Sequence, residues 1–160
     1  MLVKYIKDMK NHLSICLICA FLMSCNTKEQ SKTTTLPIVG TWRLLTGTLI
    51  EKGDTTTTDY TQGQSFIKII NDTHFAFIKH DLSKGNGASA AFDAGGGTYT
   101  LKDSIYTEHL EYYKLKEWEG GDFSFKITIK NDTFTQTGIE KIESVGINRI
   151  NTEVYVRFKK

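Results

Sequence analysis

The sequence predicts an all-β fold: a single antiparallel, up-and-down β-barrel of about eight to ten strands. Its composition is one reason, because 160 residues include a single proline and 11% aromatic residues, with abundant threonine and glycine, which favours strands and turns. A second reason is that apolar and polar residues alternate in several short runs after residue 38. The third is that short turn signals join consecutive runs, as in hairpins.

The first 24 residues have the three parts of a secretory signal peptide. Residues 1–11 are basic, residues 13–23 are almost wholly apolar, and a polar run follows Cys25. The apolar run is too short to span a bilayer comfortably, so we expect it to be cleaved. Three of the lysines and one acid precede Leu13, so the chain without this segment is formally neutral. It offers no basic surface for phosphates, and nucleic acid is not an expected partner.

The residues Leu22-Met23-Ser24-Cys25 resemble the lipobox of bacterial lipoproteins, in which diacylglycerol is attached to the cysteine. Cys16 and Cys19 lie in the segment to be removed, which leaves Cys25 as a single thiol in an exported chain. Acylation explains such an odd cysteine; an ordinary signal peptide with a leftover thiol is the alternative. The resemblance implies an anchor in the membrane of the cell envelope, on its periplasmic or surface side, and Asn26 favours the outer membrane.

The barrel domain is expected over residues 38–160, after a lipidated cysteine and a disordered polar tether at residues 25–37. Residues 38–45 predict the first strand. The clearest strand is residues 121–130, where apolar residues take every odd position from 123 to 129. Further strands are predicted over residues 64–70, 74–80, 98–101, 104–113, 133–138 and 153–158.

Short polar pairs separate several of these strands. Asn71-Asp72, Lys102-Asp103 and Asn131-Asp132 each lie between two predicted strands. Because Asn and Asp tolerate positive φ, we expect a two-residue hairpin at all three.

Three stretches interrupt the alternation. Residues 83–97, rich in glycine and alanine, are predicted to form a mobile loop at the barrel mouth, with room for a weak strand near residues 88–92. Residues 115–120 predict a helical turn or a long loop, with Trp118 as a lid. Residues 140–151 fit either a loop or a further pair of strands.

Gly40-Thr41-Trp42 opens the first predicted strand, behind the lipobox and tether and ahead of a hairpin-linked meander. This arrangement resembles the lipocalin-like domains of bacterial lipoproteins, within the wider group of lipocalins and fatty-acid-binding proteins, over residues 38–158. The resemblance implies that Trp42 closes the barrel base and that an arginine packs across it. Arg157 is the positional match, through a cation–π contact. Thr58-Asp59-Tyr60 has the letters of a lipocalin signature but lies too early in the chain to match it.

A barrel of eight or more strands has room for one small apolar or amphipathic ligand. Tyr106, Glu108 and Tyr112 share one face of the strand at residues 104–113, and an inward carboxylate needs a hydrogen bond or a polar ligand. These three form the predicted binding cluster. The alternative turns the opposite face inward, including His109 and Glu111, and leaves Glu108 in water. The predicted apolar wall of the cavity comprises Phe75, Phe77, Phe123 and Phe125.

Two functions remain open from the sequence. One is a lipid-anchored barrel that binds a small molecule; the other is a structural or interaction lipoprotein whose barrel is filled by side chains and which acts through its loops. By resemblance, Tyr155 and Arg157 match the pair that holds a carboxylate in fatty-acid-binding proteins, but Arg157 cannot do this and also cap Trp42. No catalytic motif, metal-ligand spacing or phosphate loop stands out, so no enzyme, metal or cofactor is expected.

Overall fold

The computed structural model describes residues 37–85 and 91–159, all within one compact unit, Thr35–Lys160. The predicted signal peptide, Cys25 and nearly all of the predicted tether lie outside the described residues. Within those two ranges, no helix has the length and apolar character needed to cross a membrane. The elements are β1 (Gly40–Glu51), β2 (Asp54–Asp59), β3 (Gln64–Ile70), β4 (His74–Asp81), β5 (Phe92–Lys102), β6 (Ile105–Tyr113), β7 (Asp122–Lys130), β8 (Thr133–Ile142), a 3₁₀ turn η1 (Glu143–Val145) and β9 (Ile147–Arg157).

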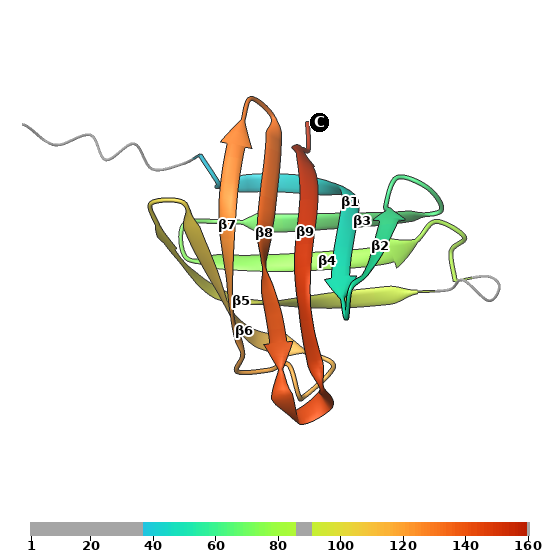
Figure 1. The fold of residues 1–160 in the computed structure, drawn as a ribbon. Coiled ribbons are helices and arrows are strands. Elements are labelled where there is room, and N and C mark those ends of the chain that lie inside the picture. Colours follow the sequence, from blue (N-terminus) through green and yellow to red (C-terminus); the bar gives the residue numbers. More distant parts are fainter. Residues whose placement is uncertain (1–36, 86–90, 160) are drawn as a thin grey trace, which may run out of the picture. The chain divides into compact units, whose positions relative to one another are not determined.

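Eight of these strands close into an antiparallel barrel (Figure 1). Neighbours pair in sequence order from β3 to β9, and β1 pairs with both β3 and β9, which closes the ring. β2 is an extra strand that pairs with β1. The predicted all-β, up-and-down barrel is therefore confirmed. Closure of the ring gives every barrel strand a neighbour on both sides, so the free strand edge lies on β2.

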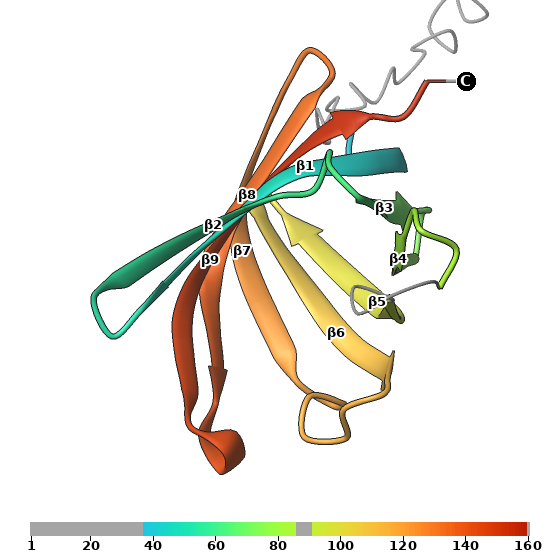
Figure 2. The ribbon, with the colours of Figure 1, turned by 90° about the vertical axis from the view of Figure 1, so that its right-hand side faces the viewer.

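β1 pairs with three other strands, β2, β3 and β9, because it bends at a β-bulge. Gly40–Arg43 pairs with β3, whereas residues 46–51 pair with β2, and the register against β9 shifts between these two halves. At the bend, the backbone N–H of Tyr60 donates to Leu45 O at 2.8 Å. The β1–β2 hairpin consequently extends beyond the ring, away from β3 and β4 (Figure 2).

The closed end of the barrel is packed by aromatic side chains around Trp42. Trp42 is fully buried, and its Nε1 donates to Ile38 O at 2.7 Å. The Phe134 ring lies 5.3 Å from the ring of Trp42 and 5.3 Å from that of Tyr155. This base is therefore filled by protein side chains and leaves no room there for a ligand.

Arg157 covers Trp42, as the sequence predicts. Its guanidinium carbon lies 4.1 Å from the centroid of the Trp42 ring, within cation–π distance. The same guanidinium donates to Val39 O at 3.1 Å and to Pro37 O at 2.8 Å. Arg157 therefore ties the last strand to the segment that enters the first one.

Two of the three predicted two-residue hairpins are present, one of them shifted by one residue. The pair Lys130–Thr133 closes the turn at Asn131-Asp132 as predicted, whereas the pair Lys102–Ile105 closes a turn at Asp103-Ser104. The first residues of these turns, Asp103 and Asn131, have φ values of 56° and 54°. The turn at Asn71-Asp72 is wider than predicted, because the strand pair that closes it joins Ile70 to Phe75. There the Asn71 side chain accepts backbone N–H groups of the loop, so it shapes the turn without needing positive φ.

The glycine-rich stretch predicted as a mobile loop is a strand over residues 92–97. These residues belong to β5 and include Gly95–Gly97. A Cβ at Gly96 would lie 2.5 Å from the carbonyl oxygen of Phe75, and one at Gly97 would overlap that of His109. The prediction is wrong here because these glycines permit a close approach of neighbouring backbones and do not mark a flexible loop.

The structure also shows the form of two segments that the sequence left open or did not predict. Residues 140–151, which fitted a loop or strands, extend β8 and β9 and are joined through the η1 turn. β2 is absent from the sequence prediction because residues 54–59 are polar throughout and almost all face solvent, so they show no alternation.

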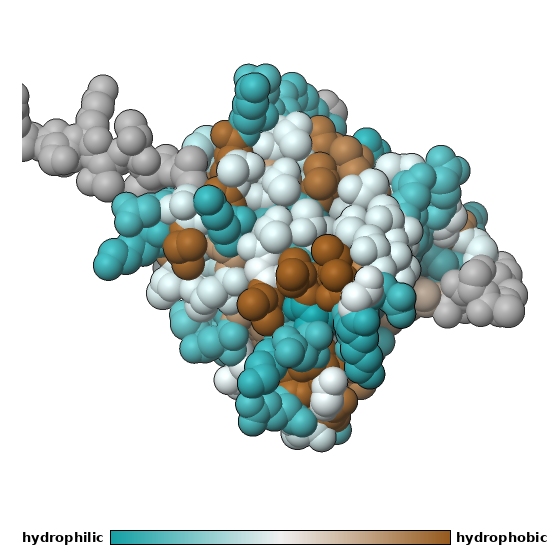
Figure 3. Space-filling model, in the orientation of Figure 1, coloured by the Kyte–Doolittle hydropathy of each residue, from teal (hydrophilic) through white to brown (hydrophobic). Residues whose placement is uncertain are grey.

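An apolar row crosses the outer surface of β1, β9 and β8. Ile50 pairs with Ile150, and Ile150 pairs with Ile139 on its other side. Their exposed fractions are 40%, 41% and 61%. Figure 3 shows apolar side chains gathered on this face among polar ones.

Candidate functional site

The barrel contains a cavity of about 220 Å³ that is lined by side chains of its strands. β9 gives its direction: Arg149, Asn151, Glu153 and Tyr155 line the cavity in turn, and Arg157, two residues further, covers Trp42 at the packed base. Tyr155 therefore marks the floor of the cavity. Arg149 marks its mouth, which lies at the end of the barrel opposite Trp42.

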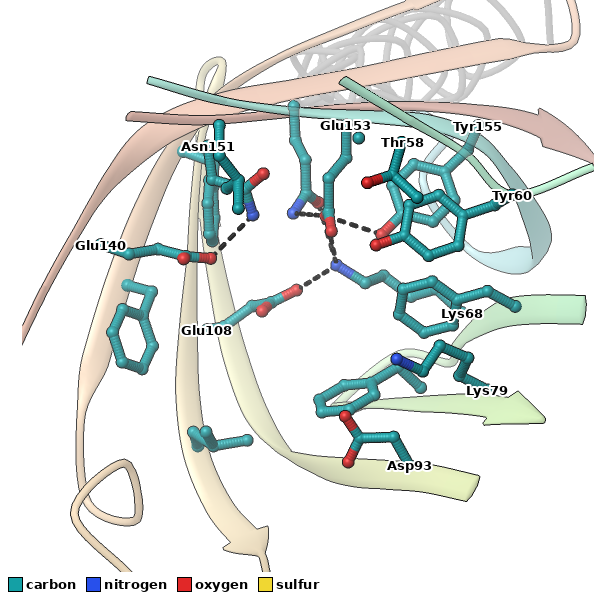
Figure 4. Close-up of a pocket in the computed structure, with 18 of the residues that line it drawn as sticks. Thr58, Tyr60, Lys68, Lys79, Asp93, Glu108, Glu140, Asn151, Glu153 and Tyr155 are labelled. Carbon is teal, nitrogen blue, oxygen red and sulfur yellow. Dashed lines mark hydrogen bonds and ion pairs between the residues drawn. The ribbon is translucent and has the colours of Figure 1, made fainter. Parts of the chain in front are cut away.

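The floor is built around a buried lysine. Lys68, on β3, is 2% exposed. Its Nζ lies 2.7 Å from Glu108 Oε1 on β6, 3.1 Å from Gln136 Oε1 on β8 and 3.8 Å from Glu153 Oε2 on β9. Figure 4 shows Glu108 and Glu153 pointing toward Lys68. We call Lys68, Glu108, Gln136 and Glu153 the floor cluster.

Glu153 is also held by neutral donors. Gln136 Nε2 and Tyr155 Oη each donate to Glu153 Oε2 at 2.7 Å. The Lys68 ammonium lies 5.2 Å from the centroid of the Tyr155 ring and 5.9 Å from that of Tyr106. The cluster therefore combines ion pairs, hydrogen bonds and cation–π contacts, which together offset the cost of burying charge.

Burial dominates the ionisation of this region. It raises the pKa of the Glu108 carboxyl above its ordinary value, and the Lys68 ammonium opposes that shift. Burial likewise raises the pKa of the Tyr106 and Tyr155 hydroxyls, with Glu108 and Glu153 respectively adding to the effect. Both tyrosines therefore stay protonated at neutral pH. The buried Tyr106 hydroxyl makes no hydrogen bond of normal geometry within the described part of the chain.

A second polar group lies nearer the mouth. Glu140 Oε2 pairs with Arg149 Nε at 2.7 Å, and Glu140 Oε1 accepts from Asn151 Nδ2 at 2.7 Å. Arg149 also lies over Trp118, 5.3 Å from the ring centroid. Both oxygens of Glu140 thus have protein partners, whereas Arg149 uses only the Nε of its guanidinium in this pair.

One side of the cavity is an aromatic wall. Neighbouring rings contact each other at centroid distances between 5.6 and 6.2 Å from Tyr60 to Phe123. At its outer edge, Tyr113 Oη donates to Asp93 Oδ2 at 3.2 Å. The cavity is therefore amphipathic, with a charged floor and an apolar side. The aromatic wall comprises Tyr60, Phe66, Phe77, Tyr113, Trp118 and Phe123.

The structure separates the predicted binding residues into three places. Glu108 lines the cavity and is 8% exposed, so its face of β6 points inward and the alternative orientation is wrong. Phe75 and Tyr106 lie below the cavity, where their rings pack 6.5 Å apart in the filled base. Tyr112 points outward and is 66% exposed. Of the predicted residues, the cavity is lined by Phe77, Glu108, Phe123 and Phe125.

The prediction for Tyr112 is wrong because β6 carries a bulge. Gly97 pairs with Leu110 but Gly96 pairs with Tyr112, so Glu111 is an extra residue in the ladder. Beyond it the alternation reverses, and Tyr113 takes the inward position that Tyr112 was predicted to hold.

Much of the floor was missed from the sequence. Lys68 interrupts an otherwise apolar run, Phe66 to Ile70, and a lone charge on a buried face is the signal that could have found it. Glu153 lies two residues before Tyr155, on the same face. Of the floor cluster, the sequence therefore predicted Glu108 alone. Trp118, predicted as a lid, contributes to the aromatic wall.

Each carboxylate that lines the cavity has at least one protein partner. Within residues 37–85 and 91–159, no three His, Cys, Asp or Glu side chains are grouped so as to hold a metal ion.

Two solved structures are similar to this chain in their backbone. A lipocalin-like protein from Bacteroides uniformis ATCC 8492 aligns with a TM-score of 0.45 and 15% identity over 75% of this chain and 97% of its own. An uncharacterized protein from Bacteroides eggerthii DSM 20697 aligns with a TM-score of 0.44 and 16% identity over 75% of this chain and 98% of its own. No family model and no curated protein matches the sequence.

Proposed function

We propose that this protein binds one small amphipathic molecule inside the barrel and does not catalyse a reaction. The observation that carries this proposal is the amphipathic cavity: a floor of Lys68, Glu108, Gln136 and Glu153 opposite an aromatic wall. Concave sites with apolar lining and a few convergent polar groups are typical of ligand pockets. A barrel filled for side-chain packing alone gains nothing from four charged or polar groups at its centre.

The size of the cavity limits the ligand. Its volume of about 220 Å³ is below the roughly 300–1,000 Å³ typical of sites for drug-sized molecules. The ligand is therefore small, with a polar end that reaches the floor cluster and an apolar body beside the aromatic wall.

Native mass spectrometry of the protein purified from cells, followed by organic extraction, tests this proposal. A bound mass that is released by extraction is expected. Trp118 lines the cavity and Trp42 is buried at the base, so a ligand should change Trp118 fluorescence in a Trp42→Phe variant. A protein free of any small molecule that also fails to bind hydrophobic dyes would contradict the proposal.

Two glutamates of β6 provide a matched pair for the site. Glu108 lines the cavity, whereas Glu111 lies outside and accepts hydrogen bonds from Thr98. Glu108→Gln should weaken ligand binding and Glu111→Gln should leave it unchanged. Equal effects would place the ligand elsewhere.

We also propose that the protein is attached to the cell envelope through Cys25, with the outer membrane favoured. The support is the lipobox-like Leu22-Met23-Ser24-Cys25 and the polar residues that follow it. Metabolic labelling with a fatty acid should mark the wild type and not Cys25→Ser. Absence of label in both would indicate a protein released without a lipid anchor.

An interaction lipoprotein is the second candidate function. The outward row of Ile50, Ile150 and Ile139 favours it, because exposed apolar residues that adjoin one another are characteristic of contact surfaces. This candidate gains support if the purified protein contains no ligand, binds no dye and self-associates less after Ile139→Lys.

A further inference from the structure

The floor cluster has more carboxylate charge than ammonium charge. One ammonium, Lys68, faces two carboxylates, Glu108 and Glu153, whose side chains are 10% and 15% exposed. When both carboxylates are ionised, the three groups have a net charge of −1. An uncompensated charge is costly in a buried site. A bound cation would remove this imbalance, whereas a bound anion would increase it.

The cation at the floor is not available to an anionic ligand. Lys68 is engaged by Glu108 and Gln136 at 2.7 and 3.1 Å, so an anion there would have to displace Glu108. Breaking a buried ion pair leaves an unpaired charge, which opposes such an exchange. Arg149, which pairs with Glu140 through Nε alone, lies at the mouth of the cavity and not at its floor.

The floor also keeps one acceptor open. Both hydrogen bonds of Glu153, from Gln136 and Tyr155, use Oε2. Its Oε1 makes no hydrogen bond or ion pair with any residue that the structure describes, and Glu153 lines the cavity. A ligand N–H group can therefore bind this oxygen without breaking an existing contact, whereas a ligand carboxylate cannot.

Lys79 does not reverse this preference. Lys79 lies two residues nearer the mouth along the β3–β4 ladder, since it pairs with Phe66, whereas Lys68 pairs with Phe77. Two residues of strand correspond to roughly 7 Å, and Lys79 is only half-buried. Its charge is therefore displaced from Glu153 and screened by solvent.

We infer that the ligand is a small organic cation, a primary amine carried on an aromatic or other apolar body, with its ammonium bound to Glu153 Oε1. The aromatic wall suits both parts of such a molecule, because its rings contact the apolar body and attract a nearby ammonium through their faces. This inference rests on the proposed binding function and deepens it by naming the class of ligand.

Binding should depend on pH through Glu108. Its carboxyl faces Lys68 from β3 and Glu153 from β9, beside Tyr106 of its own strand, and burial raises its pKa. An ammonium ligand favours ionised Glu108, so the amine should bind more tightly as pH rises through the pKa of Glu108. The amine itself stays protonated well above neutral pH, as lysine does.

Three probes with the same aromatic body and different charge test the inference on the full chain. They are 2-phenylethylamine, 2-phenylethanol and 3-phenylpropionate, titrated by calorimetry at neutral pH. We expect the amine to bind at least about tenfold more tightly than the alcohol, and the carboxylate to bind most weakly. A hydrophobic dye is titrated in parallel to report whether the cavity binds anything.

Two variants locate the ammonium. Glu153→Gln keeps the shape of the side chain and removes its charge, so it should reduce amine affinity about tenfold and change alcohol affinity by less than about twofold. Glu111→Gln, on the outer surface, is the control and should change neither. Near-ultraviolet circular dichroism shows whether Glu153→Gln is folded. If it is not, the ranking of the three probes on the wild type decides the question.

The outcomes separate the inference from the function on which it rests. Equal affinities for the three probes, preference for the carboxylate, or binding of the dye without the amine would overturn the amine inference and leave ligand binding intact. Failure of every probe and of the dye would contradict the proposed function itself.

Discussion

The ammonium of Lys68 and the carboxylate of Glu108 lie 2.7 Å apart across the interior of the barrel. They belong to β3 and β6, which are separated around the ring by β4 and β5, and Glu153 reaches the same ammonium from β9. The pair therefore crosses the barrel and does not link neighbouring strands. Its geometry depends on closure of the whole ring, so stability and the candidate site are coupled at this point.

Lys68→Met should destabilise the protein much more than Glu108→Gln. Removing the ammonium leaves Glu108 and Glu153 buried together without a counter-charge, which should cost about 3–5 kcal/mol of unfolding free energy. Removing the Glu108 charge leaves Lys68 with Glu153 and Gln136, and the amide can still accept a hydrogen bond. That variant should lose about 1–2 kcal/mol. Urea denaturation at neutral pH measures both.

Lys126→Met is the control for this comparison. Lys126 is exposed on β7, and its replacement should change the unfolding free energy by less than about 0.5 kcal/mol. If Lys68→Met and Glu108→Gln cost the same, Lys68 is not the counter-ion of two carboxylates.

The stability of the protein should fall as pH rises above the ordinary Glu value. The folded state raises the pKa of Glu108 above 4.5, so between 4.5 and the folded pKa the folded protein holds a proton that the unfolded chain has released. Folding is then favoured at the acidic end of this window, and the gain is lost as pH passes the folded pKa. The unfolding free energy of the wild type minus that of Glu108→Gln, measured across this range, should decrease with pH. A constant difference would show that Glu108 does not titrate in this way.

The barrel could be predicted from the sequence because its signals are local. Residues 122–130 alternate between exposed positions and buried or half-buried ones, and Asp103 and Asn131 take the positive φ expected of two-residue turns. The contact between Trp42 and Arg157 could be predicted for a different reason. A short motif and its position in the chain indicated this pair of residues.

The floor of the cavity could not be predicted in the same way because it is not local. Gln136 and Glu153 face each other across the β8–β9 hairpin, but Lys68 reaches them only through closure of the ring, and no spacing in the sequence joins it to them. One extra residue, Glu111, was enough to move Tyr112 from the inside of the barrel to the outside. A bulge has no reliable sequence signal here, yet it reverses every side chain beyond it.

Arg157→Lys should weaken the closed end of the barrel. Lysine retains the charge, but it cannot reproduce the flat guanidinium over Trp42 together with the hydrogen bonds to Pro37 O and Val39 O. We expect a loss of about 1–3 kcal/mol in unfolding free energy. Arg43→Lys, at an exposed position of β1, is the matched control and should be nearly neutral. Equal small effects would mean that Arg157 contributes only its charge.

Gly40→Ala should weaken the same contact without changing either partner. Gly40 has a φ of 149°, and a Cβ there would overlap Arg157 Nη1. The side chain of Arg157 has to move away from Trp42, and alanine is also strained at this φ, so the loss should be at least that of Arg157→Lys. In the double variant the two losses should add only in part, because both substitutions weaken the contact between Trp42 and Arg157. Full additivity in urea denaturation would show that the two substitutions act separately.

Gly97→Ala should be among the most damaging single-methyl additions in the barrel. Its Cβ would overlap the carbonyl oxygen of His109, which is backbone of the paired strand and cannot rotate away as a side chain can. The strands would have to separate beside the β6 bulge, at a cost of about 3 kcal/mol or more. Thr100→Ala, at an exposed position further along β5, should change the unfolding free energy by less than about 0.5 kcal/mol. Wild-type stability of Gly97→Ala in thermal and urea unfolding would show that residues 92–97 are not held as a strand, which would restore the loop predicted from their composition.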